Sequence, residues 1–159
     1  IDVLEKVIAE RPQTAVAIIG SGELQEKIQM LIKEKKLDNN IEMLGFVENP
    51  LKIMHDAKVL VMTSRWEGTP MVALEAMALG LPIVGTPTDG LKDVVVNGKT
   101  GWLSDDEIEL AKKIRVILTN YTAQENRKQK IIKKIMKNDI IEKYKSKITN
   151  VYRKNANNH

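Results

Sequence analysis

Apolar residues recur along this chain in two alternating patterns. Short continuous runs, rich in β-branched residues, are typical of strands, and those at residues 14–20 and 58–64 have the character of buried strands. Between the runs, apolar residues recur at helical spacing with charged residues on the opposite face. The patterns predict strands at residues 14–20, 41–47, 58–64 and 81–86, and helices at residues 1–12, 23–37, 49–57 and 69–79.

The helix expected at residues 69–79 has recognisable ends. Thr69 is placed to cap its N-terminus, Pro70 suits its first position, and Gly80 follows as a C-terminal cap. Strands that alternate with helices and are continuously apolar predict an α/β domain, in which helices cover both faces of a parallel sheet. The pattern loosens after residue 86 and becomes helical again from residue 105 to the end.

The composition is that of a soluble globular protein, with 43% hydrophobic and 29% charged residues, and the chain length suits one domain. The absence of cysteine excludes disulfides and cysteine-based metal sites, and it fits a reducing, cytoplasmic location. No cluster of residues with metal-ligand spacing occurs, and neither histidine stands in a catalytic context. The first residue is Ile1, and we expect the chain to be a piece of a longer protein.

The net charge of +4 originates in the last part of the chain. Residues 121–159 contain 11 Lys and Arg against 3 Asp and Glu, whereas residues 1–120 contain 14 against 18. We therefore expect a domain at residues 1–120 and a basic helical tail at residues 121–159 that packs on it. The tail also has the composition of a contact with an anionic membrane surface. Nucleic-acid binding is disfavoured, because the lysines of the tail accompany aliphatic residues at helical spacing and few aromatic residues lie among them.

Ligands of parallel sheets bind beyond the carboxyl ends of the strands, where loops lead into helices. At residues 20–23, "GSGE" is either a plain tight turn or a loop whose small residues let the backbone approach a phosphate or ribose. At residues 45–49, "GFVEN" is either a platform for a flat base or a turn with Phe46 packed in the core.

The third loop leads into the helix at residues 69–79, which contains one carboxylate in an otherwise apolar run. The residues three and four positions from Glu75 are all apolar and offer it no cation. A buried carboxylate is costly unless it has a partner. Glu75 therefore needs a structural ion pair with a Lys or Arg from elsewhere in the fold, backbone donors, or the hydroxyls of a ligand. Glu67, in the loop before the helix, could hold the other end of a polyhydroxylated ligand, with the free N–H groups of the helix start facing a phosphate.

A specific resemblance involves the same residues. "SRWEGTPMVALEAMALGLPIVGTPTDGLKDVVVNGKTGWL", at residues 64–103, contains E-x7-E at Glu67 and Glu75, then EAMA-x-G-x-P-[IV]-V, then N-G-x-T-G. Over about residues 1–120, the sequence resembles the retaining GT-B glycosyltransferases of family 4, also called group 1. The resemblance implies a Rossmann-like parallel sheet, the C-terminal, donor-binding half of a GT-B fold.

The resemblance also implies roles for individual residues. Glu67 would be the catalytic candidate and contact the donor sugar, and Glu75 would bind the ribose diol of the nucleotide. The donor would be a nucleotide-diphosphate sugar, which we expect to be UDP-linked, and neither a metal nor another cofactor is expected. The remaining donor-binding positions would be Gly20 and Gly22 on the nucleotide side, Phe46 and Val47 at the base, and Arg65, Gly68, Thr69, Met71 and Val72 near the diphosphate and sugar.

The sequence departs from the family's pattern in three places. Pro70 lacks an N–H group that could contact a phosphate. Asp89-Gly90 and Asp93 replace the family's Gly-Gly and Glu, which leaves the role of that loop open. The family's upstream Arg and Lys, the strand that carries them and the N-terminal acceptor domain have no counterpart from Ile1 onward.

We therefore expect a fragment of a bacterial hexosyltransferase that is inactive alone. The intact enzyme would build a surface polysaccharide or lipid-linked glycan in the cytoplasm, with the tail returning to the acceptor domain or touching the inner face of the membrane. Two alternatives stay open. A UDP-sugar epimerase-like GT-B domain should lack the EAMA-x-G-x-P context, and a non-catalytic binding module is suggested only by the basic tail.

Overall fold

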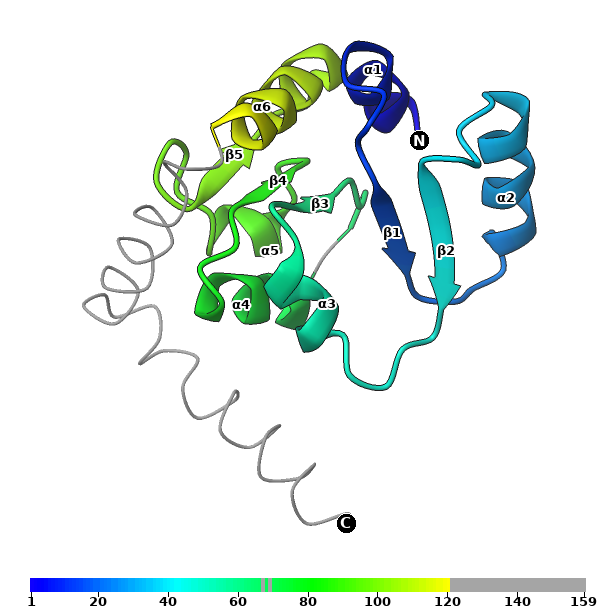
Figure 1. Cartoon of the computed structure of the whole chain (residues 1–159). Coiled ribbons are helices and arrows are strands. Elements are labelled where there is room, and N and C mark those ends of the chain that lie inside the picture. The colour runs from blue at the N-terminus through cyan, green and yellow to red at the C-terminus, as the bar shows by residue number, and fades with distance from the viewer. Residues whose placement is uncertain (67, 69, 121–159) are drawn as a thin grey trace.

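The computed structural model describes residues 1–66, 68 and 70–120. Helices and strands alternate along this part of the chain, as the sequence predicted (Figure 1). The predicted tail at residues 121–159 lies outside the described residues. The helices are α1 (Asp2–Glu10), α2 (Gln25–Glu34), α3 (Leu51–Asp56), α4 (Met71–Ala78), α5 (Asp89–Lys92) and α6 (Glu107–Thr119), and the strands are β1 (Val16–Ile19), β2 (Ile41–Gly45), β3 (Leu60–Met62), β4 (Ile83–Gly85) and β5 (Gly101–Leu103).

The strands are parallel, as predicted, but in the described part of the chain they form two sheets instead of one. Strand β1 pairs with β2, with Val16 opposite Ile41, while β4 lies between β3 and β5. The described residues provide no strand that bonds to the other edge of β1 or of β3. The side chains of Ala17 and Ile19 are exposed. The prediction of a buried strand at residues 14–20 is therefore wrong for one of its two faces.

Three hydrophobic clusters hold these elements together. The first lies between β3–β4 and helices α3, α4 and α5, and it includes Ile83. The second lies on the other face of the same strands, where Val84 packs against α1 and α6. The third places α1 and α2 against one face of β1–β2. Helices thus cover both faces of the β3–β4–β5 sheet but only one face of β1–β2.

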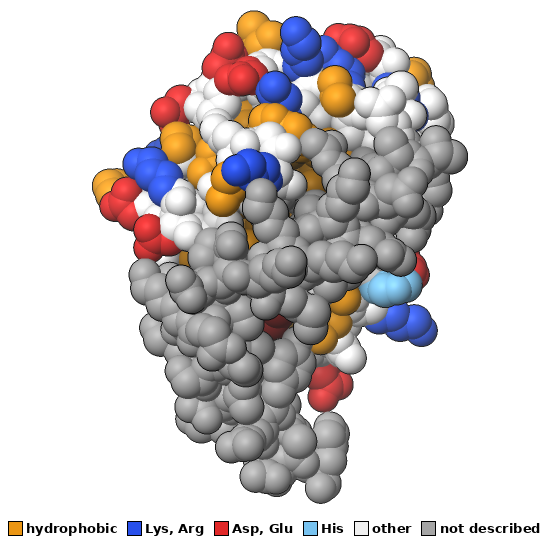
Figure 2. Space-filling view, turned by 90° about the vertical axis from the view of Figure 1, so that its left-hand side faces the viewer, with side chains coloured by type: hydrophobic (Ala, Val, Ile, Leu, Met, Phe, Trp, Pro, Cys, Tyr) orange, Lys and Arg blue, Asp and Glu red, His pale blue; other side chains and the backbone are white. Residues whose placement is uncertain are grey.

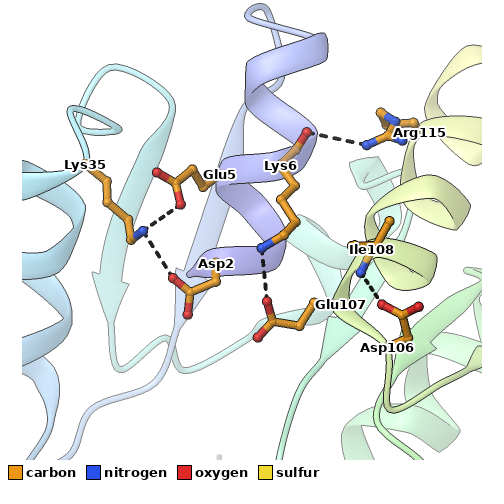
Figure 3. Close-up of polar contacts among 8 residues, drawn as sticks. All are labelled: Asp2, Glu5, Lys6, Lys35, Asp106, Glu107, Ile108 and Arg115. Atoms are coloured by element: carbon orange, nitrogen blue, oxygen red, sulfur yellow. Dashed lines mark hydrogen bonds and ion pairs between the residues drawn. The ribbon is translucent and has the colours of Figure 1, made fainter.

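Polar contacts also fix helix α1 between its neighbours (Figure 3). Lys6 pairs with Glu107 of α6 at 3.0 Å, and the guanidinium of Arg115 donates to the Lys6 carbonyl at 3.4 Å. On the other side, Lys35 contacts both Asp2 and Glu5. The hydrogen bond from Lys35 holds the pKa of Asp2 below its ordinary value. These partly exposed contacts lie at the surface and add little stability by themselves, but they define how α1 lies.

Helix α4 ends as the sequence predicted but begins one residue later. Gly80 has a φ of +69°; its N–H donates to the Met77 carbonyl, and the Leu81 N–H donates to the Ala76 carbonyl. These two bonds form a Schellman cap, which confirms Gly80 as the C-terminal cap. At the other end, Pro70 itself is the N-cap, with an extended ψ of 95°, and Met71 is the first helical residue. Thr69 is therefore not the N-cap, because the chain becomes helical only after Pro70.

Between residues 86 and 105, where the hydrophobic pattern predicted no regular element, the structure has one short helix, α5, and one strand, β5. The side chain of Asn97 accepts a hydrogen bond from the Leu103 N–H at 2.8 Å.

Within the described residues, no helix is long and apolar enough to cross a membrane.

Two buried threonines provide a test of this packing. The Thr100 hydroxyl accepts a hydrogen bond from the Val96 N–H at 2.8 Å, whereas the buried Thr88 hydroxyl has no partner among the described residues. An unsatisfied buried polar group costs about 1–3 kcal/mol. We expect Thr88→Val to raise the free energy of unfolding by about 1 kcal/mol and Thr100→Val to lower it by a similar amount. Urea denaturation of both variants measures this, and equal effects would contradict the assignment.

Candidate functional site

The loops that follow β1 and β2 are joined to each other. Gly20, at the end of β1, has a φ of +125°, and its N–H donates to the Gly45 carbonyl at 2.7 Å. Apart from the glycine itself and its two chain neighbours, no described residue has an atom within 4 Å of the position that a Cβ would occupy at Gly20 or Gly22. The backbone of this loop is therefore open on the side where a ligand could approach.

Phe46 follows directly after β2 and is 80% exposed. The alternative in which Phe46 packs in the core is therefore wrong. The reason lies in its place in the fold, because Phe46 stands beyond the end of β2 and not within the sheet. Val47, the next residue, is half-buried. The exposed ring of Phe46 is free to stack on a planar group.

The loop after β3 leads into α4. Its described residues include Arg65, which is exposed, and Trp66, which is 90% exposed. Sequence reasoning missed Trp66, because an aromatic residue next to a strand is ordinarily expected in the core. Glu67 and Thr69 lie outside the described residues, so their proposed roles stay predictions.

The first turn of α4 has backbone donors that find no acceptor in the described part of the chain. The Met71 and Val72 N–H groups have no acceptor among the described residues, whereas the N–H groups of Ala73 and Leu74 donate to the Pro70 carbonyl. The side chains of Met71 and Val72 pack on the first hydrophobic cluster, which leaves only their backbone groups for a ligand. Such amides, at the positive end of the helix, favour an anion.

Glu75 lies in the middle of α4, between Leu74 and Ala76, which are both buried. Its carboxylate is half-buried and has no ion pair or hydrogen bond among the described residues. Burial therefore raises the pKa of Glu75 above its ordinary value. The alternative of a structural ion pair finds no support in the described part of the chain. Among the described residues, no donor contacts this carboxylate.

The turn after β4, at residues 86–90, contacts the loop after β3. The Thr86 hydroxyl donates to the Ser64 carbonyl at 2.6 Å, and Gly90 lies against Gly68 and Pro70. The sequence analysis left the role of this turn open. Gly90, which stands within the family's motif, was the only residue that indicated a close backbone contact here. The described residues contain no group of three or more side chains that could hold a metal ion.

Comparison with known proteins agrees with this geometry. A family model described as "Glycosyl transferases group 1" matches residues 1–139. The poly(ribitol-phosphate) alpha-N-acetylglucosaminyltransferase of Staphylococcus aureus is 30% identical over 151 residues, which are 91% of this chain and 31% of that protein. The poly(glycerol-phosphate) alpha-glucosyltransferase of Bacillus subtilis is 35% identical over 98 residues, which are 61% of this chain and 15% of that protein.

Solved structures share the fold. A mutant of S. aureus TarM, in complex with fondaparinux, alpha-GlcNAc-glycerol and UDP, has a TM-score of 0.81 at 27% identity, over 91% of this chain and 31% of that one. WaaG, a glycosyltransferase involved in lipopolysaccharide biosynthesis, has a TM-score of 0.75 at 17% identity, over 87% of this chain and 39% of that one. This chain therefore spans less than a third of the length of these curated relatives. Its fold is that of the GT-B glycosyltransferases, and the chain belongs to the group 1 glycosyltransferase family.

Proposed function

We propose that this chain is the donor-binding part of a retaining glycosyltransferase and that it binds a UDP-sugar. The observation that carries the proposal is Glu75, a half-buried carboxylate that has no protein partner in the described part of the chain. It lies on a helix whose first two amides also have no partner there. A nucleotide diphosphate matches both features, because its ribose offers two hydroxyl donors and its diphosphate offers anionic acceptors.

Each group then has a role. Glu75 accepts hydrogen bonds from the ribose diol, and the N–H groups of Met71 and Val72 contact the diphosphate. Arg65 adds positive charge, and Phe46 and Val47 contact the base, with Gly20 and Gly22 close to the nucleotide. Glu67 contacts the donor sugar. Donors fixed near the departing diphosphate stabilise the charge that develops as the glycosidic bond breaks, without a metal ion.

The remainder of the enzyme would come from a longer polypeptide. The share of the relatives' length that this chain covers supports an additional acceptor domain. In the described part of the chain, β1 and β3 each have one edge without a hydrogen-bonded strand. Edges of this kind are normally paired or covered, which supports one further strand between the two sheets. The whole enzyme would transfer a sugar to a surface polysaccharide or lipid-linked glycan at the inner face of a bacterial membrane.

The face of the molecule in Figure 2 gives no support to a nucleic-acid-binding module where the structure is described. On the face in Figure 2, Lys and Arg side chains alternate with Asp and Glu side chains where the structure is described. Residues 1–120 also contain more acidic than basic residues. A phosphate backbone would instead require a basic patch or stripe.

The ribose assignment can be tested by comparing two ligands. We expect the chain to bind UDP more tightly than 2′,3′-dideoxy-UDP, because only UDP has the diol. Glu75→Ala should weaken UDP binding about tenfold or more and remove this preference, since each charge-assisted hydrogen bond contributes about 1.5–3 kcal/mol. Glu34→Ala, on the exposed surface of α2, is the matched control and should change neither affinity. Titration calorimetry measures these affinities, and a preference for UDP that survives in Glu75→Ala would contradict the contact.

The cost of the unpaired carboxylate predicts a pH dependence. Burial raises the pKa of Glu75 in the folded state, so the folded protein holds this proton more tightly than the unfolded chain does. The Glu75 contribution to stability therefore becomes unfavourable as pH rises through the folded-state pKa. We expect Glu75→Gln to be more stable than wild type at pH 7, with a difference that shrinks as pH falls toward 4.5, the ordinary pKa. Urea denaturation at both pH values tests this, and a less stable Glu75→Gln at pH 7 would indicate a protein partner instead.

The isolated chain should not transfer sugar. Positioning of an acceptor against the donor can supply about 7–11 kcal/mol of the barrier, and the acceptor half is proposed to lie elsewhere in the polypeptide. We therefore expect the 159-residue chain to bind UDP but to show no transfer from UDP-glucose or UDP-GlcNAc in a radiolabel assay. Measurable transfer to any acceptor would overturn the two-domain proposal.

A further inference from the structure

We infer that Thr86 and Gly90 are positioning residues, which hold the loop between β3 and α4 in place from the neighbouring turn. They make no proposed contact with the donor. The ligand-binding consequence of this inference rests on the proposed function, whereas its structural consequence does not.

The Thr86 contact fixes the start of the loop. The Thr86 N–H donates to the Met62 carbonyl at 3.0 Å, which extends the pairing of β3 and β4 by one bond. The Thr86 hydroxyl then donates to the Ser64 carbonyl at 2.6 Å, two residues farther along the loop. The first residues of the loop therefore follow β4 beyond the end of the sheet.

The Gly90 contact fixes the end of the loop. Gly90 is buried in α5, and a Cβ at this position would lie 1.7 Å from the Gly68 carbonyl oxygen and 2.9 Å from Cδ of Pro70. Ordinary contacts begin at 3.4 Å, so any side chain here would force the two backbone segments apart. Neither obstacle is the flexible end of a side chain, so local rearrangement cannot relieve the clash easily. The absence of a side chain at Gly90 is what allows the loop to lie where it does.

These two contacts decide where α4 begins. Pro70 is the N-cap of α4, and its carbonyl accepts the first hydrogen bonds of the helix. A displacement of Gly68 and Pro70 therefore moves the free amides of Met71 and Val72, and with them the axis on which Glu75 lies. Small displacements of a binding group cost much of its interaction, because these hydrogen bonds depend on distance and direction.

The test compares two glycines that both have close backbone neighbours. A Cβ at Gly101, in β5, would lie 2.0 Å from the Ile83 carbonyl oxygen, so Gly101→Ala creates a comparable clash within the sheet. Backbone amide resonances of the ¹⁵N-labelled 159-residue chain report each change locally. We expect Gly90→Ala to shift the amides of Gly68, Met71 and Val72 and to leave that of Trp102 nearly unchanged, and Gly101→Ala to do the reverse.

UDP affinity gives the second measurement. Gly90→Ala should weaken UDP binding about tenfold or more, whereas Gly101→Ala should change it less than about twofold. If wild type binds UDP but Gly90→Ala neither shifts these amides nor weakens binding, the positioning role is overturned. If wild type does not bind UDP, the proposed function fails, while the amide shifts still decide whether Gly90 positions the loop.

Thr86 provides a milder pair of variants, which decides the question if Gly90→Ala does not fold. Thr86→Val removes the donor to the Ser64 carbonyl and keeps the shape of the side chain, while Thr86→Ser keeps the donor. We expect Thr86→Val to shift the amides of Gly68 and Met71 and to weaken UDP binding severalfold, and Thr86→Ser to resemble wild type. Equal behaviour of the two variants would overturn the positioning role of the hydroxyl.

Discussion

The burial of helix α1 is the contact on which the rest of the described structure depends. Val3 and Val7 on one side of the helix pack with α6 and β4, while Ile8 packs with α2 and β2. No hydrogen-bonded strand joins the two sheets in the described part of the chain. Helix α1 joins them instead, because it contributes side chains to the hydrophobic clusters of both sheets. Each fully buried valine or isoleucine side chain stabilises this arrangement by about 1.5–3 kcal/mol. The position of the loops after β1 and β2 relative to the loops after β3 and β4 therefore depends on α1, although no residue of α1 belongs to the candidate site.

At the β3–β4–β5 sheet, the candidate site depends on the packing of backbone segments more than on contacts between charged side chains. The turn at residues 86–90 reaches the loop after β3 through one hydroxyl and one glycine, and neither contact involves a charged group. Contacts of this kind hold backbone amides in a fixed direction, which a flexible lysine or arginine could not do. Preorganised amides would suit the proposed diphosphate site, because they need little reorganisation when charge develops.

The sequence predicted the order and type of most elements, because strand and helix periodicities are local properties. It also predicted the C-terminal cap at Gly80, because the positive φ that such a cap requires is adopted most readily by glycine. It could not show that Ile19 is exposed or that Phe46 stands beyond the sheet, since both depend on which neighbours the strands obtain. Strand β5 was missed because Gly101–Leu103 is short and begins with a glycine, and that glycine is needed for close approach to Ile83. The importance of Gly90 depends likewise on a contact between segments more than 20 residues apart.

Helix α4 is held by ordinary hydrophobic packing, yet it contains polar groups that have no hydrogen-bond partner among the described residues. Its apolar residues secure the helix in the first cluster, and Gly80 closes its C-terminal end with two hydrogen bonds. The same helix keeps the amides of Met71 and Val72 without acceptors and the Glu75 carboxylate without donors among the described residues. A leucine at position 75 would suit the helix better, and folding alone gives no reason for the carboxylate. On the function proposed above, the amides and the carboxylate of this helix would complement a ligand that has both anionic oxygens and hydroxyls, and the proposal thereby gives a reason for the one acidic residue in an apolar helix.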